Sequence, residues 1–399
     1  MARNNERKSN FDKGGSNMKP SDQYFFPTYE EARRAFRKRS TDVAAVWPEA
    51  SLTQYAVGKP ENNNTTDIIA ADAKYHSNTL IVVTTGVHGI EGYAGSALLQ
   101  LFIDEYLTQL NPNTTGLRLV HAVNPWGMKN RRRVSENNVD LNRNFIKDWN
   151  SVPASLNERF EKEKKHFVPE GPVKSWKKQR KNLLGALGAK VFKRGVSGLE
   201  KAATMGQYQY PTGIFYGGAA HEEPVEKLLA HMDEWVKEYE TVVHIDIHTG
   251  LGPAEQLWLQ VPHSDPRKEK QLRKQFGHPE VNDVQKTDVR EIKGEDAEYV
   301  KDVYSRKHPD KYIFSCLLEF GTIGNRLPDQ MRALDIVVHE NQYYWYGAKK
   351  EKDAKELQKE FHQLFDPPEE SWRQAVLKKG KAGFNLVLEK EAGVQIVKK

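Results

Sequence analysis

The sequence predicts an α/β fold, with a mixed, mostly parallel central sheet flanked by helices and a basic helical insertion. Apolar, β-branched runs such as LIVVTT alternate with amphipathic helical segments, which is the order of a βαβ sheet. The chain has 399 residues, 38% of them hydrophobic, which is enough for a large buried core. A charged stretch without a β pattern separates the earlier strand-like runs from the later ones.

The first part of the chain alternates between helical and extended patterns. Pro27 precedes a segment in which apolar residues recur at helical spacing, and small residues dominate the segment after the run LIVVTTG. The expected elements are, in order, a helix at 29–45, short strands at 54–58 and 67–73, a buried strand at 78–86, a helix at 92–107 and a strand at 117–127.

The second part resumes this alternation after an interruption. Residues 150–210 are charged and helix-prone, with proline and glycine breaks, and we expect a mostly helical basic insertion there. The pattern weakens after residue 365, so we expect one main domain at 23–365 and a C-terminal extension at 366–399. The elements expected after the insertion are a helix at 222–239, strands at 241–252 and 311–324, and a helix at 328–348.

Composition limits the compartment and the partners. Residues 1–22 are polar, so we expect a disordered tail and not a secretory signal. No run of about 18 apolar residues occurs, so we expect a cytoplasmic protein with no membrane partner. The formal net charge is +6, but the basic residues gather in stretches such as KSWKKQRK, which we interpret as solvated surface. We therefore do not expect a nucleic-acid partner. The single cysteine, Cys316, lies in an apolar run and is expected in the core.

His88 and Glu91 lie where a predicted strand gives way to a helix, with two residues between them. Such a spacer lets both side chains reach one cation, and imidazole nitrogen and carboxylate oxygen are zinc ligands. A third ligand is then expected from a distant segment, and His248, at the end of another predicted strand, is the best candidate. Ligands gather at the carboxyl ends of strands in open α/β sheets. A helix start without a metal would also explain His88 and Glu91 taken alone.

Two carboxylates complete this hypothesis. Glu319 ends an apolar strand, where a carboxylate is costly unless it is used. Beside a zinc ion it can take a proton from water as a general base, although a bond to a backbone turn would also explain it. Asp246 shares a strand face with His248, and we infer that it supports this ligand from behind.

The stretch NRRRVSENNVDLNRNF concentrates arginine and asparagine after a predicted strand. Guanidinium groups bind carboxylates through two parallel hydrogen bonds, so arginines near a zinc ion suggest an anionic substrate end or an oxyanion. A solvated basic loop is the alternative. That alternative fits Arg131 better than Arg143, which lies between Asn142 and Asn144 just before Phe145.

Taken together, VHGIEG, DLNRNF, HIDIHTG and LLEFGTIG, in this order, resemble the motifs of the zinc carboxypeptidase family. The resemblance covers about residues 23–365. It is strongest to a bacterial branch in which GVHGIEG, DLNRNF and a stretch like YPTGIFYGG (residues 210–218) also recur. It implies the fold of that family, a catalytic domain at 23–365 and one Zn²⁺ per chain.

The resemblance also implies roles for individual residues. The implied roles are zinc ligation by His88, Glu91 and His248, general base and acid catalysis by Glu319, binding of a terminal carboxylate by Asn142 and Arg143, orientation of His88 by Asp140, and polarisation of the scissile carbonyl by Arg133 or, as second choice, Arg132. The mobile tyrosine of digestive carboxypeptidases has no clear counterpart, and Tyr299 and Tyr304 are the candidates.

The function that follows is a zinc-dependent hydrolase that cleaves an amide bond next to a free C-terminal carboxylate, with a peptide as substrate. An N-acyl amino acid amidohydrolase with the same metal site is the alternative enzyme. A polyanion-binding protein with an inactive pocket is the alternative from another class. The sequence does not give the oligomeric state.

Overall fold

The computed structural model describes residues 20–194, 205–286 and 293–397. Its centre is an eight-stranded sheet with the strand order β1-β2-β4-β3-β5-β8-β6-β7. The strands are β1 Ser51–Ala56, β2 Thr65–Ala71, β3 Thr79–Thr85, β4 Thr115–His121, β5 Thr241–Gly250, β6 Leu257–Val261, β7 Asp283–Lys286 and β8 Tyr312–Gly321.

The four inner strands β4, β3, β5 and β8 are parallel. Strands β1 and β2 pair antiparallel with their neighbours, and β6 is antiparallel to β8 but parallel to β7. The predicted mixed, mostly parallel α/β sheet is therefore confirmed. Along each inner strand almost every residue is buried, because helices cover both faces of the sheet. The carboxyl ends of the parallel strands meet at one edge, and polar residues near the ends of β3, β5 and β8 lie close together there.

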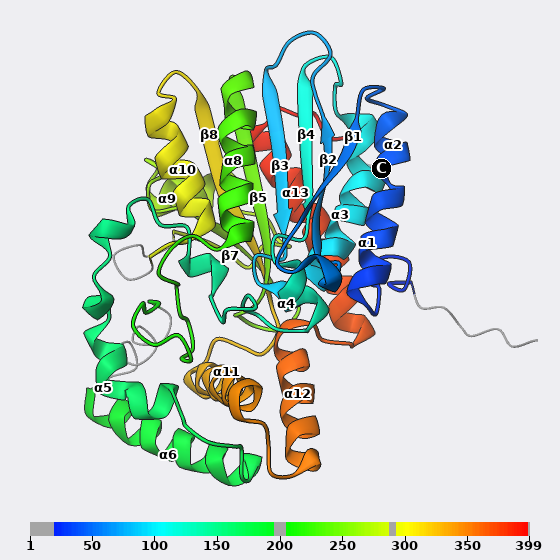
Figure 1. Cartoon of the computed structure of the whole chain (residues 1–399). Helices are drawn as coiled ribbons and strands as arrows, with labels where there is room; N and C mark the ends of the chain where they lie inside the picture. The colour runs from blue at the N-terminus through cyan, green and yellow to red at the C-terminus, as the bar shows by residue number, and fades with distance from the viewer. Residues whose placement is uncertain (1–19, 195–204, 287–292, 398–399) are drawn as a thin grey trace, which may run out of the picture.

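Helices flank the sheet on two sides (Figure 1). One face packs against α1, α2, α3, α9 and α13, and the other against α8 and α10. The helices are α1 Tyr29–Lys38, α2 Ser40–Ala44, α3 Gly92–Tyr106, α4 Pro125–Lys129, α5 Glu158–Phe167, α6 Trp176–Arg194, α8 Glu223–Glu238, α9 Glu269–Phe276, α10 Asp296–Lys307, α11 Leu327–Tyr346, α12 Glu351–Phe365 and α13 Glu370–Glu391.

A helical lobe formed by α5, α6, α11 and α12 lies beyond the edge of the sheet where α4 is found (Figure 1). Two of these helices, α5 and α6, come from the stretch expected to be a basic insertion. The lobe has an apolar core of its own, and part of it reaches the turn after β3, where Ile90 packs with Trp176 and Phe365. The lobe thus supports the edge of the sheet that carries the polar residues.

The segment expected as a C-terminal extension contains α13, which packs against α3 and supplies side chains such as Phe384 and Leu388 to the main core. The helical pattern at 29–45 corresponds to two helices, α1 and α2. The tail expected at 1–22 lies outside the described residues except for 20–22. Within the described part of the chain, no helix is long and apolar enough to cross a membrane.

Candidate metal centre

The turn after β3 brings His88 and Glu91 to the carboxyl edge of the sheet. The strand ends at Thr85, and Gly86 then turns the chain with φ +67°, a backbone conformation that favours glycine. His88 precedes a short 3-10 turn, Gly89–Glu91, that leads into α3. Strand β5 runs parallel to β3, with Ile247 opposite Thr85, so His248 lies directly beside this turn.

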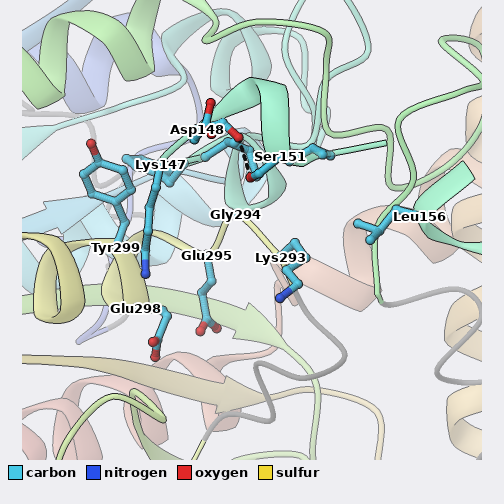
Figure 2. A pocket seen from close by; sticks show the side chains of 12 residues that line it. Lys147, Asp148, Ser151, Leu156, Lys293, Gly294, Glu295, Glu298 and Tyr299 are labelled. Carbon is cyan, nitrogen blue, oxygen red and sulfur yellow. Dashed lines mark hydrogen bonds between the residues drawn. The ribbon is translucent and has the colours of Figure 1, made fainter. Parts of the chain in front are cut away.

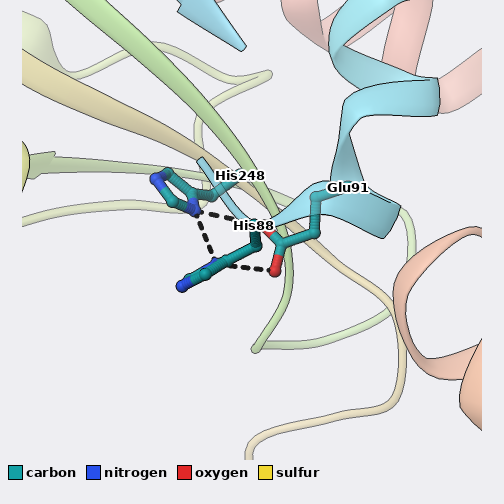
Figure 3. Close-up of side chains that lie close together, drawn as sticks. All are labelled: His88, Glu91 and His248. Carbon is teal, nitrogen blue, oxygen red and sulfur yellow. Dashed lines mark hydrogen bonds and ion pairs between the residues drawn. The ribbon is translucent and has the colours of Figure 1, made fainter. Parts of the chain in front are cut away.

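Three buried side chains converge at this point (Figure 3). His88 Nδ1 lies 2.8 Å from Glu91 Oε1, and His248 Nδ1 lies 3.1 Å from Glu91 Oε2. The two Nδ1 atoms are 3.2 Å apart. One ligand atom from each residue lies within 4.8 Å of the others, which is close enough for all three to hold one metal ion.

The outer nitrogen of each imidazole faces a buried aspartate. His88 Nε2 lies 3.0 Å from Asp140 Oδ1, and His248 Nε2 is paired with Asp246 Oδ2. A carboxylate opposite Nε2 favours the tautomer with the proton on that nitrogen, which leaves a lone pair on Nδ1. Two lone pairs and the Glu91 carboxylate then face one another, and only a positive charge between them makes this arrangement favourable. The donor set of two imidazoles and one carboxylate fits zinc.

The pKa values of Glu91 and His248 also show how charge is arranged among these three side chains. Burial would raise the pKa of Glu91, but His88 and His248 outweigh it and lower this pKa to about 2. Burial would lower the pKa of His248, but Asp246 and then Glu91 outweigh it and place this pKa well above its ordinary value. Both shifts favour a carboxylate beside a positive charge. The group therefore holds a carboxylate next to a positive charge, which either an imidazolium proton or a metal ion supplies.

Glu319 lies next to this group on the neighbouring strand. In the parallel pair β5 and β8 it is opposite His248, and its Oε1 accepts a hydrogen bond from Leu251 N at 3.0 Å. Its side chain is almost completely buried. Burial, and after it the Glu91 carboxylate, raise the pKa of Glu319 to about 8. A carboxyl group with a raised pKa beside a candidate metal centre has the properties of a proton-transfer group.

The three consecutive arginines point in different directions. Arg133 is paired with Asp140 Oδ2, the carboxylate that also holds His88. Arg132 is directed to α11, where its Nε lies 3.0 Å from Glu340 Oε1. Arg131 pairs with Asp366 at 3.3 Å. The structure therefore brings Arg133 to the carboxylate behind His88, a candidate metal ligand, and directs Arg132, the second choice from the sequence, to a different ion pair.

Asn142 and Arg143, here called the clamp residues, form a short turn right after Asp140 and are both buried. Arg143 Nη1 donates to Asn142 O at 2.6 Å, and Asn142 Oδ1 accepts a hydrogen bond from Asp296 N at 3.0 Å. Burial lowers the pKa of Arg143, Asp140 acts in the opposite direction and the nearby Arg133 cation adds to the lowering. A second charged guanidinium so close to Arg133 favours an anion at this position.

Asp296 is a site residue that sequence reasoning missed. It is buried at the start of α10, and its carboxylate lies within 4.8 Å of ligand atoms of Asp246 and His248. Burial and then the Asp246 carboxylate raise the pKa of Asp296 well above its ordinary value. In the sequence it stands in GEDAEY, where an acidic residue at a helix start gives an ordinary capping signal. His244 is buried behind the site and contacts Thr84 and Ser315.

A cavity of about 430 Å³ lies between residues 145–156 and the segment 293–299, which includes the start of α10 (Figure 2). Its wall at Gly294 borders the clamp residues, because a Cβ atom at Gly294 would collide with Arg143 O. Glu295, Glu298 and Lys293 give the cavity charges of both signs. Tyr299 lines it, whereas Tyr304 is fully buried and is excluded as a mobile tyrosine.

Comparison with known proteins gives a family and a fold. A family model described as "Protein of unknown function (DUF2817)" matches residues 25–379. No curated protein matches the sequence. Carboxypeptidase A from Helicoverpa armigera is similar in structure, with a TM-score of 0.50 and 11% identity over 93% of this chain and 74% of that chain. The similarity to this carboxypeptidase confirms that the fold is that of the zinc carboxypeptidase family.

Weaker similarities extend to other proteins. Bovine thrombin-activatable fibrinolysis inhibitor, in complex with tick carboxypeptidase inhibitor, gives a TM-score of 0.44 at 13% identity over 85% of this chain and 99% of that chain. Succinylglutamate desuccinylase from Chromobacterium violaceum gives 0.36 at 12% identity over 76% and 72%.

Proposed function

The chain belongs to the family described as a protein of unknown function (DUF2817), and we propose that it is a zinc-dependent hydrolase that cleaves an amide bond next to a free carboxylate. The observation that carries this proposal is the convergence of His88 Nδ1, His248 Nδ1 and the Glu91 carboxylate, with an aspartate behind each imidazole. The neighbouring carboxyl group of Glu319 would supply proton transfer. The guanidinium groups of Arg133 and Arg143 would bind the carbonyl oxygen and the carboxylate of the substrate.

Each side chain has a distinct task in this proposal. A zinc ion, when bound, supplies a Lewis acid that polarises a carbonyl group and acidifies water. Glu319 accepts the proton of the attacking water and later returns it to the leaving amine. Asp140 and Asp246 keep the proton of each imidazole on Nε2, which keeps both Nδ1 atoms available.

The arginines define the substrate end. Arg133 would donate hydrogen bonds to the carbonyl oxygen as negative charge develops on it. Arg143 and Asn142 would hold the carboxylate of the substrate, which places the neighbouring amide bond over the site. A peptide with a free C-terminus and an N-acyl amino acid both present this carboxylate. The proposal favours the peptide, with N-acyl amino acids as the second substrate class.

Metal content is the first test. Elemental analysis of the purified wild-type protein should find one zinc per chain, and His88→Ala should lose most of it. His263→Ala, which alters an exposed histidine away from the site, is the matched control and should keep the metal. Equal zinc in the wild type and His88→Ala, or no zinc in either after supplementation, would remove the basis of the proposal.

Substrate selectivity is the second test. Wild-type protein should hydrolyse a peptide with a free C-terminus much faster than the same peptide amidated. Arg143→Ala should lose this preference, while Arg131→Ala, an arginine paired with Asp366, should retain it. N-acyl amino acids belong in the same screen because they separate the peptidase from the deacylase. Equal cleavage of both peptides by the wild type would argue against a carboxylate clamp.

A further inference from the structure

The segment YPTGIFYGG, residues 210–218, has no role in the chemistry proposed above, yet it wraps around the loop that carries Asp140 and the clamp residues. Asp140 N donates to Tyr216 O at 2.7 Å. Asn144 Nδ2 donates to Gly217 O at 2.8 Å, and Asn138 Nδ2 donates to Gly213 O at 2.9 Å. The segment therefore contacts this loop before, at and after the site residues.

Phe215 is the unusual residue of this segment. Its φ is +52°, the left-handed region that bulky side chains rarely adopt. Neighbouring backbone contacts impose this conformation, since Phe215 O accepts a hydrogen bond from Gln207 N at 3.0 Å and Gly217 N donates to Gln207 O at 2.8 Å. Strained conformations persist where the surrounding structure holds them, and they gather at functional sites.

The ring of Phe215 lies against two arginines. The guanidinium carbon of Arg133 is 5.1 Å from the ring centre, and that of Arg143 is 5.9 Å away. The face of an aromatic ring carries partial negative charge and attracts cations. Two guanidinium groups close together repel each other, and the Asp140 carboxylate, the Glu295 carboxylate and the face of the Phe215 ring offset this repulsion. The ring is half-buried, so it also limits access of water to one side of the pair.

We propose that Phe215 is a positioning residue that orients two guanidinium groups, that of Arg143 to hold the substrate carboxylate and that of Arg133 to donate to the neighbouring carbonyl oxygen. This inference rests on the proposed function, because it assigns to the arginines the tasks described there. Phe215 acts through the arginines and makes no bond to the reacting atoms in this proposal.

Binding of a small carboxylate tests the inference without turnover. Calorimetry with N-acetylglycine and N-acetylglycinamide compares a free carboxylate with the matched amide on the zinc-loaded protein. The wild type should bind N-acetylglycine more tightly. Phe215→Leu, which keeps apolar volume but removes the ring, should weaken its binding roughly tenfold and leave the amide unaffected. Phe215→Tyr keeps the ring face and should retain wild-type affinity.

Tyr210→Leu is the matched control in the same segment. Its ring stacks on Phe160 with centres 6.0 Å apart and contacts Lys164, so its loss should leave the preference for the carboxylate unchanged. Equal affinity of the wild type, Phe215→Leu and Phe215→Tyr for N-acetylglycine would overturn the positioning role while the clamp stands. A wild type that binds the acid and the amide equally would instead overturn the clamp, and the inference with it.

Discussion

Glu319 and His248 lie opposite each other on β8 and β5, so the proposed proton-transfer group and a proposed metal ligand are held by two directly paired strands. The hydrogen bond from Leu251 N to Glu319 Oε1 orients the carboxylate further. A carboxylate held in this way is both correctly placed and able to accept a proton. Replacing it by an amide of the same shape keeps the placement and removes the basicity.

Glu319→Gln should keep zinc and the fold, because the amide oxygen can still accept from Leu251 N. It should lose about 10²–10⁴-fold in turnover, since an amide cannot take the proton of water. Steady-state kinetics together with metal analysis measure both effects. Near-native turnover in a zinc-loaded Gln variant would show that another group transfers the proton.

Lysine substitutions separate the roles of Arg132 and Arg133. Arg133→Lys keeps the charge beside Asp140 but loses the planar donors, and we expect a loss of about 10²–10³-fold in turnover with little change in stability. Arg132→Lys loses hydrogen bonds to Glu340 and Asn341, and we expect it to cost about 1–3 kcal/mol of stability with near-native turnover. Urea unfolding and steady-state kinetics measure stability and turnover of both variants. A loss of turnover in Arg132→Lys with a loss of stability in Arg133→Lys would show that the two roles are assigned the wrong way round.

At the scale of elements, the ends of β5 and β8 are held by the junction between α12 and α13. Thr249 Oγ1 donates to Phe365 O at 2.5 Å, and Thr322 Oγ1 donates to Leu364 O at 2.6 Å. Trp372 Nε1, from α13, donates to Gly321 O at 2.9 Å. The strand ends that carry His248 and Glu319 are thus fastened by residues far along the chain.

The turn that carries His88 and Glu91 depends on close contact with α4. A Cβ atom at Gly89 would collide with the backbone of Gly127 and Met128, which cannot yield as a side chain would. Gly89→Ala should therefore destabilise the protein by about 1–3 kcal/mol or more and weaken zinc binding. Gly185→Ala on α6 has open space around it and should stabilise by about 0.5–1 kcal/mol. Urea unfolding of both variants checks the opposite signs, and equal effects would contradict the packing argument.

At the scale of the whole molecule, pH acts on stability through groups that burial keeps neutral. His121 is fully buried between Phe36 and Tyr29, with ring centres 5.2 and 6.3 Å away, and neither ring nitrogen has a hydrogen-bond partner among the described residues. Burial lowers its pKa from 6.5 to about 3. As the pH falls below 6.5, the unfolded chain binds a proton at His121 that the folded chain does not, so unfolding becomes more favourable.

At pH 5 the free energy of unfolding should be about 2 kcal/mol lower than at neutral pH because of His121 alone. His121→Phe lacks the titrating group, so its free energy of unfolding should fall less steeply between pH 7 and pH 5 than that of the wild type. Urea unfolding at several pH values gives both slopes. Identical slopes would mean that His121 does not titrate differently in the two states.

Much of the fold was predictable because its strongest signals are local. The apolar runs of β3, β5 and β8 and the helical period of α8 depend on residues close in sequence. Residues 253–286 carry β6, α9 and β7, which escaped prediction. The five residues of β6 alternate between buried and half-buried and give a weak signal. The pattern of α13 is likewise diffuse, with little contrast between its two sides, although it forms part of the core.

The sequence by itself determined the α/β class and the chemical groups that stand at the ends of β3, β5 and β8. A local pattern of apolar residues predicts where a buried strand runs and where it ends. Parallel strands then bring their carboxyl ends to one edge of the sheet. Only the tertiary structure decided that Arg133 joins Asp140 while Arg132 turns to Glu340, that Asp296 lies beside Asp246, and that Phe215 faces two arginines. These outcomes depend on the side chains' surroundings, and most of those surroundings come from segments far apart in the chain.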